Sequence, residues 1–173
     1  MGRYIVALHA GHNSSALIGD ASGIHFAVQE ERITREKNFW GLPRNALRAC
    51  LDHVGASPQD VDLVAYGGRQ VFSRYHSRED VIEAYRRQTT LLGKLRQRLA
   101  MPLLVGLKPT LGQDKLHTFL AEEGMADAGV VFHAHHHTHA ATAYYGLRKD
   151  PVEEYLVVTC DGAGDNACAT VSV

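Results

Sequence analysis

The chain has 173 residues, of which 45% are hydrophobic and 21% are charged, and its formal net charge is −1. These values are typical of a globular domain with its own core, and the balanced charge gives no general reason to expect a nucleic-acid partner. No apolar run approaches the length that spans a bilayer, and nothing resembles a signal peptide, so we expect a cytoplasmic protein without membrane contact. The three cysteines lack CxxC spacing and are expected to be reduced, mostly buried thiols.

Strand and helix patterns alternate along the chain, which predicts an α/β fold. The first half predicts three meandering strands, a helix that ends at Gly55 and a further strand, at 4–8, 16–18, 24–29, 43–54 and 62–66. The second half predicts a short helix stopped at Gly124, a strand at 130–132, and a histidine-rich helix stopped at Gly146. A strongly apolar strand at 155–160 follows, with a hairpin partner at 167–173.

The segment between the fourth strand and the short helix is basic. Residues 69–98 carry eight Lys or Arg and three Asp or Glu, and their apolar residues keep helical spacing. This pattern predicts an amphipathic helix at about 79–99 with a basic outer face. An anionic ligand or a nucleic acid could dock there, but a solvated face is the interpretation that we favour.

Histidines are concentrated before and within the predicted helix near residue 135. His135 and His139 are four residues apart, so on a helix their side chains lie on one face, one turn apart. Two imidazoles placed in this way can bind one divalent metal ion, whereas His136 and His137 point elsewhere. The alternative is a solvated tract that binds metals without specificity.

Two other polar segments are candidates for ligand contacts. The loop at 9–15 is rich in hydroxyls and exposed amides and could cradle a phosphate or a carbonyl oxygen, although a plain hairpin turn is the alternative. The run at 30–37 is densely charged and follows a predicted strand. Such a run is usually a solvated face with ion pairs between residues four apart.

Four blocks, taken together, resemble the N-terminal part of the NodU/TobZ-type O-carbamoyltransferases. They are His12–Ala16, Glu30–Lys37, His135–Ala141 and Asp161–Asp165. That family is Kae1-like and has the actin-like ATPase (RNase H-like) fold. The resemblance therefore implies an α/β lobe with a mixed β-sheet and flanking helices over 1–150. Residues 151–173 would be the first hairpin of a second lobe, and the chain would be interrupted there.

The resemblance implies an enzyme that transfers a carbamoyl group to the hydroxyl of a small-molecule acceptor. A C-terminal YrdC-like module, missing from this chain, would make the donor, carbamoyl-adenylate, from carbamoyl phosphate and ATP. The metal ligands of the family match His135, His139 and Asp161. Neutral imidazoles with a carboxylate suit Fe(II) or Zn(II). Gly162 and Gly164 would let the backbone approach a phosphate of the nucleotide.

The same resemblance assigns roles to the charged block and to the first loop. Arg32 would face the nucleotide, and Arg35 and Lys37 would supply positive charge near the carbamoyl or phosphate oxygens. His12 could accept the proton of the acceptor hydroxyl. The block departs from the family pattern at Asn38, where many members have histidine.

Two other functions remain open from the sequence. One is a metal-binding module without catalysis, based on the histidine tract. The other is a relative of the family that transfers threonylcarbamoyl to tRNA. The basic segment at 69–98 favours this function, whereas the charged run at 30–37 speaks against it. The apolar C-terminal strands lack sheet neighbours in this chain, which predicts a homo-oligomer formed through them. We also expect the 173-residue chain alone to be inactive.

Overall fold

The computed structural model describes most of the chain outside the basic segment. It covers 4–71, 112–147, 154–165 and 167–173, with Arg86, Thr90, Leu92, Lys94, Leu95 and Leu99. The predicted basic helix at 79–99 therefore falls almost entirely outside the described residues. Among the helices that are described, none has both the length and the apolar character needed to span a bilayer.

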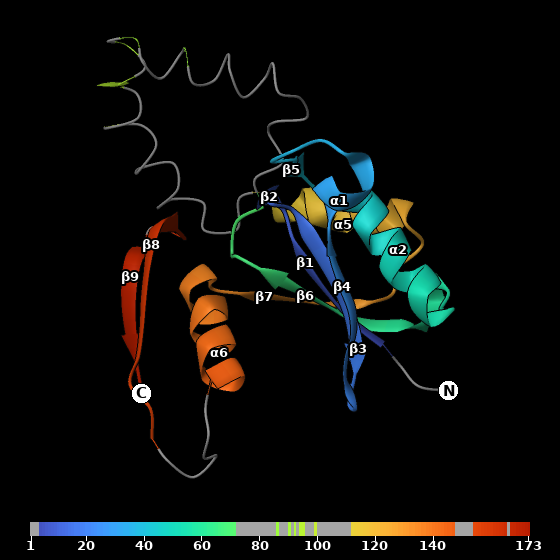
Figure 1. Cartoon of the computed structure of the whole chain (residues 1–173). Helices are drawn as coiled ribbons and strands as arrows, with labels where there is room; N and C mark the ends of the chain where they lie inside the picture. The colour runs from blue at the N-terminus through green and yellow to red at the C-terminus, as the bar shows by residue number, and fades with distance from the viewer. Residues whose placement is uncertain are drawn as a thin grey trace.

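A five-stranded mixed sheet forms the centre of the molecule (Figure 1). Its strands, in spatial order, are β4 (Gly23–Gln29), β3 (Ser15–Asp20), β1 (Tyr4–His9), β6 (Val61–Gly67) and β7 (Gly129–His133). The first three strands of the chain form an antiparallel meander, and β6 and β7 run parallel to β1. This mixed sheet with flanking helices confirms the predicted α/β fold class.

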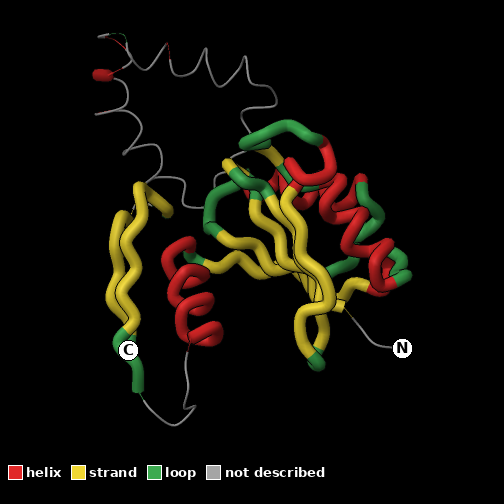
Figure 2. The backbone as a smooth tube through the Cα atoms, in the orientation of Figure 1, coloured by secondary structure: helices red, strands yellow, loops and turns green. Residues whose placement is uncertain are grey.

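Helices lie on both sides of the sheet (Figures 1 and 2). On one side are α1 (Glu30–Thr34), α2 (Arg44–Val54) and α5 (Gln113–Glu122). On the other side is α6 (His135–Leu147), which begins two residues after β7. Because α6 continues through Gly146, the predicted glycine stop at that residue is wrong. The short η1 (Pro58–Asp60) leads into β6.

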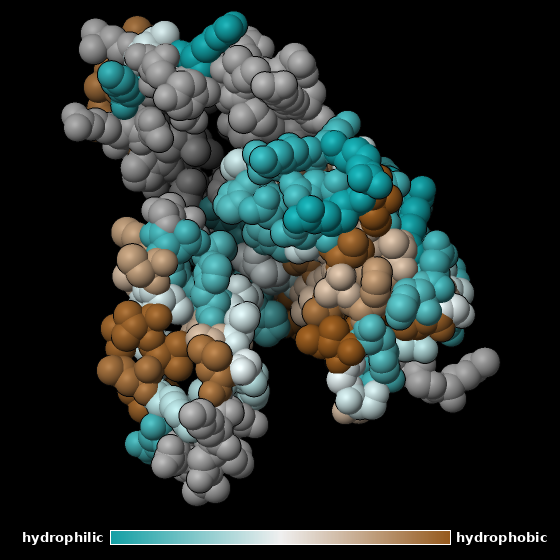
Figure 3. Space-filling model, in the orientation of Figure 1, coloured by the Kyte–Doolittle hydropathy of each residue, from teal (hydrophilic) through white to brown (hydrophobic). Residues whose placement is uncertain are grey.

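The end of the chain forms a separate two-stranded antiparallel sheet of β8 (Val157–Gly164) and β9 (Ala167–Ser172), which packs against α6. The predicted strand at 155–160 extends further, because β8 continues to Gly164 with a register shift between Cys160 and Gly164. Apolar side chains gather on the outer surface of this hairpin (Figure 3). Its assignment to a second lobe stays a prediction.

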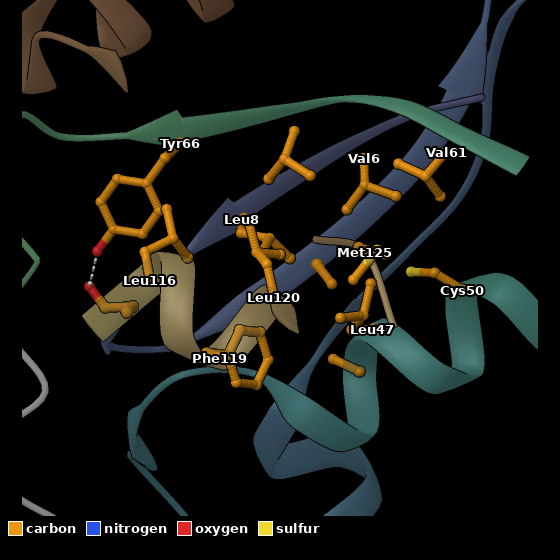
Figure 4. Packing of buried hydrophobic residues seen from close by; sticks show 14 of the residues in the cluster. Val6, Leu8, Leu47, Cys50, Val61, Tyr66, Leu116, Phe119, Leu120 and Met125 are labelled. Atoms are coloured by element: carbon orange, nitrogen blue, oxygen red, sulfur yellow. Dashed lines mark hydrogen bonds between the residues drawn. The ribbon is translucent and has the colours of Figure 1, made fainter. Parts of the chain in front are cut away.

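The hydrophobic core lies between the sheet and the helices α2 and α5 (Figure 4). Alternate residues of the central strands, such as Val6 and Leu8, point to this side because successive side chains of a strand face opposite ways. They meet the apolar faces of the two helices, formed by Leu47, Cys50, Leu51, Leu116, Phe119 and Leu120. The opposite face of the sheet is left for α6 and for the cleft described below.

The exposure of the cysteines differs from the prediction. Cys50 is fully buried in the core, and burial raises the pKa of its thiol to about 11. Cys160 and Cys168 are exposed, so the prediction of mostly buried thiols is wrong. The reason is that the hairpin packs only against α6, and no described residue covers these two side chains.

Candidate metal centre

A cleft opens at the carboxyl ends of the three parallel strands, between the sheet and α6. His9 ends β1, Gly67 ends β6 and His133 ends β7, so these residues meet at one edge of the sheet. Open α/β sheets commonly bind ligands at this edge. The cleft has a volume of about 710 Å³, and its polar lining includes His9, His12, Asn13, Ser15, Gln29, His133, His135, Thr138, His139, Thr142 and Asp161.

Three side chains converge beside this cleft. His135 and His139 lie one turn apart on α6, and their Nε2 atoms are 3.0 Å apart. Asp161 comes from β8, and its Oδ2 lies 2.8 Å from Nε2 of His135 and 3.4 Å from Nε2 of His139. The structure therefore brings together the three residues that the sequence and the resemblance selected.

The separations between these atoms fit a single metal ion. Ligands at about 2.0–2.1 Å from an ion are about 2.9 Å apart in octahedral and about 3.3 Å apart in tetrahedral geometry. The observed separations of 2.8 to 3.4 Å span these values. With three protein ligands and partly exposed side chains, a bound ion would keep a position open for a substrate, as catalytic sites do.

Asp165 is a site residue that the sequence reasoning did not select. One of its carboxylate oxygens accepts a hydrogen bond from the backbone N–H of His135 at 2.7 Å, and both oxygens accept from the N–H of Arg69 at 3.0 Å. Asp165 therefore caps the start of α6 and ties it to the loop after β6. Sequence rules for helix capping consider only the residue just before a helix and its near neighbours. They therefore could not identify Asp165, which lies 30 residues after His135 in the chain.

His136 is not one of the three converging ligands, as expected, although its ring centroid lies 5.6 Å from that of His135 and 6.3 Å from that of His139. It is buried, and its Nε2–H donates to the carbonyl oxygen of Ala167 at 2.9 Å. Its Nδ1 lies 2.8 Å from the hydroxyl oxygen of Thr159. The backbone at Gly164 also approaches α6 so closely that a Cβ there would overlap the ring of His135. Close packing therefore joins α6 to the hairpin.

His9 is a second residue that was not selected. Its Nδ1 lies 3.4 Å from the carbonyl oxygen of Gly67. Burial has the largest effect and lowers the pKa of His9, the contact with the Gly67 carbonyl opposes it, and the nearby imidazoles of His12 and His135 add smaller effects that lower the pKa. The neutral form is therefore favoured at this position. The feature of the sequence that could have identified His9 as a site residue is its position at the carboxyl end of a predicted strand, where ligands commonly bind.

His12 lines the cleft from the short strand β2 (Gly11–His12), which pairs with β5 (Trp40–Gly41). Its ring lies edge-on to that of Trp40, with centroids 5.7 Å apart. The amide nitrogen of Asn13 lies 3.2 Å from His12 Nδ1. In neutral His12, Nδ1 then accepts this hydrogen bond and Nε2 carries the proton, so a general base would require the other tautomer.

The three cations of the charged block are not among the residues that line the cleft. Arg32 lies on α1, and Arg35 and Lys37 follow it, all with exposed side chains. The first residue of the block has a structural role instead, because buried Glu30 accepts three hydrogen bonds at the start of α2. Gly162 lies beside Asp161 in β8.

The fold and this cluster define a class of protein, a mixed α/β lobe with a candidate metal site at the carboxyl edge of its sheet. Residues 5–172 match a family model described as the carbamoyltransferase N-terminus. The chain belongs to this family of carbamoyltransferase N-terminal domains.

Curated relatives include the nodulation protein NolNO of Sinorhizobium fredii, 27% identical over 165 residues, covering 94% of this chain and 21% of NolNO. Another is the uncharacterized protein sll1178 of Synechocystis sp., 26% identical over 170 residues, covering 92% of this chain and 25% of that protein. The chain thus spans a quarter or less of the length of these relatives. Among solved structures, YeaZ from Pseudomonas aeruginosa is similar, with a TM-score of 0.39 and 16% identity, over 84% of this chain and 49% of YeaZ.

Proposed function

We propose that this domain transfers a carbamoyl group from carbamoyl-adenylate to the hydroxyl of a small-molecule acceptor. Membership of the carbamoyltransferase family supports the class of reaction. The donor would be formed from carbamoyl phosphate and ATP by a YrdC-like module elsewhere in the protein. The cleft beside α6 has room for a ligand and polar side chains to orient it.

The observation that carries the proposal is the convergence of His135, His139 and Asp161 on one point beside the cleft. In the proposal these residues hold a divalent ion, Fe(II) or Zn(II), for which two imidazoles and a carboxylate are suitable ligands. The ion would offset negative charge on the phosphate of the nucleotide. The Gly162–Gly164 backbone lies beside Asp161, where glycines permit close approach of a phosphate.

In the transfer step, the acceptor oxygen bonds to the carbamoyl carbon, and the bond from that carbon to the AMP oxygen breaks. The hydroxyl proton must leave as this bond forms, and AMP departs with the electron pair. His12 is the proposed acceptor of the proton, in the tautomer that leaves Nε2 unprotonated, since it lines the cleft and its side chain is exposed. The proposed contacts to the nucleotide and the carbamoyl group are Arg32, which lies on α1, and Arg35 and Lys37, which follow it.

The test is carbamoyl transfer by the protein that joins this domain to its adenylate-forming module. His139→Ala should reduce transfer about a hundredfold or more while formation of carbamoyl-adenylate continues, because only the transfer domain is changed. His137→Ala is the matched control, because His137 lies on the same helix with an exposed side chain, and this variant should keep activity. Lys37→Ala should reduce transfer about tenfold, the scale of one lost charge-assisted contact.

The alternatives give different outcomes in the same experiment. Metal binding without any carbamoyl transfer by the joined protein would favour a non-catalytic metal-binding module. Transfer of threonylcarbamoyl to tRNA would favour the alternative function of a threonylcarbamoyl transferase. Normal carbamoyl transfer by His139→Ala would contradict the role proposed for the metal ligands.

A further inference from the structure

The place of Asp161 depends on how the hairpin is held against α6. His135 and His139 belong to one helix, so α6 alone sets their spacing, whereas Asp161 belongs to β8. We propose that His136 and Thr159 are positioning residues that hold Asp161 against the two histidines. This inference rests on the proposed function, because it concerns the same metal ligands.

The contacts between these residues form one consistent chain of donors and acceptors. Because His136 Nε2–H donates to the Ala167 carbonyl, Nδ1 of the neutral ring accepts from the Thr159 hydroxyl. The same hydroxyl oxygen accepts from the backbone N–H of Thr170 at 3.2 Å. His136 and Thr159 are only 4% and 7% exposed, so water does not compete freely for these bonds. A buried polar network satisfied in this way favours a single arrangement of its members.

Thr159 acts on Asp161 through the geometry of the strand. Thr159 and Asp161 lie two residues apart in β8 and both contact α6, Thr159 through His136 and Asp161 through His135 and His139, so a contact that fixes Thr159 also restrains the neighbouring Asp161. The register shift begins after Cys160, which makes the pair Thr159–Thr170 one of the last regular pairs before it. Beyond the shift, Asp165 accepts from the N–H of His135. The strand is therefore fixed to α6 on both sides of Asp161.

The test compares Zn²⁺ affinity, measured by calorimetry against a competing chelator, in Thr159→Val and Thr159→Ser variants of the 173-residue chain. Valine keeps the shape of the side chain and removes the hydroxyl, so affinity should fall about tenfold or more, as for other residues that support metal ligands. Serine keeps the hydroxyl and should keep the affinity of the unchanged chain. His136→Ala should weaken binding as Thr159→Val does, and exposed His137→Ala should not.

The double variant His136→Ala with Thr159→Val separates a shared role from two independent effects. If the residues act as one unit, the double variant binds Zn²⁺ no more weakly than the weaker single variant. Equal affinities for Thr159→Val and Thr159→Ser would overturn the inference, and this comparison stands even if His136→Ala does not fold. Zn²⁺ binding that survives His135→Ala would instead contradict the metal site itself. If His135→Ala loses Zn²⁺ binding but Thr159→Val keeps the affinity of the unchanged chain, the positioning role is overturned and the metal site itself is not.

Discussion

At the scale of single residues, neighbouring histidines of one helix have different surroundings. His135 and His139 face the cleft, His136 is buried against the hairpin, and His137 is exposed. A helix turns by about 100° per residue, so adjacent side chains necessarily point in different directions. A dense histidine tract in this context is therefore neither uniformly solvated nor uniformly available to a metal.

The reactivity of the three cysteines tests the burial that the structure assigns to each thiol. Iodoacetamide should modify Cys168 in the native chain and should modify Cys50 only after unfolding. Cys50 is fully buried with a pKa raised to about 11, so little reactive thiolate is present near neutral pH. Mass spectrometry of native and urea-treated samples measures this difference. Equal modification of all three thiols in the native chain would contradict the packing of α2.

The sequence could predict the site residues that depend on short-range spacing. The helical face shared by His135 and His139 follows from their separation of four residues, and Asp161 followed from the resemblance of its block to the family. Asp165 and His9 could not be predicted in this way. Their contacts join residues 30 or more apart in the chain, and only the folded topology brings such residues together.

At the scale of elements, the charged segment after β4 shows how one run can contain residues with unlike roles. The N-terminal residues of α2 have no capping side chain of their own, because the residue before the helix is Pro43. Glu30 supplies the cap, with its oxygens 2.7 Å from the backbone nitrogen of Ala46 and 3.1 Å from that of Asn45. The beginning of the run is thus structural, while its three cations are exposed.

Removing this cap should destabilise the fold. Glu30→Ala is expected to lower the free energy of unfolding by about 1–3 kcal/mol, because the backbone N–H groups of Asn45 and of buried Ala46 lose their acceptor. Urea unfolding followed by circular dichroism measures the change. Glu36→Ala, from the exposed end of the same run, is the control and should change stability by less than about 0.5 kcal/mol. An equally small effect at Glu30 would show that the cap contributes nothing.

Most elements could be predicted, whereas their ends often could not. The apolar periodicity of 44–54 and the glycine after it fix α2, which ends at Gly55 as expected. Gly146 was misjudged because a glycine near a helix end stops the helix only where the backbone becomes left-handed. The extension of β8 through Gly164 depends on pairing with β9 across a register shift, which local sequence does not encode.

At the scale of the whole molecule, the two sides of the sheet differ in how completely they are covered. The side with α2 and α5 holds the continuous hydrophobic core. The other side has α6, the cleft and the hairpin, whose outer face is apolar (Figure 3). Val158 and Val171 are cross-strand partners there, with 64% and 67% of their surfaces exposed. Such a face stabilises association with another apolar surface.

We therefore predict that the 173-residue chain forms a dimer or a higher oligomer through β8 and β9. Light scattering at micromolar concentration measures its mass. Val158→Lys should shift the chain toward the monomer, because burying an unpaired ammonium in the interface is costly. Val28→Ala, on the central sheet, is a control that should leave the association unchanged. A monomer at all concentrations, with β8 and β9 protected from hydrogen exchange, would contradict this prediction.

We propose above that His135, His139 and Asp161 together bind one metal ion. The most direct test is equilibrium binding of Zn²⁺ to the chain after stringent removal of adventitious ions, compared with the His135→Ala/His139→Ala double variant. We predict one bound equivalent that the double variant loses and that His137→Ala retains, because only the first two histidines adjoin Asp161. Retention of that equivalent at unchanged affinity by the double variant would contradict the account.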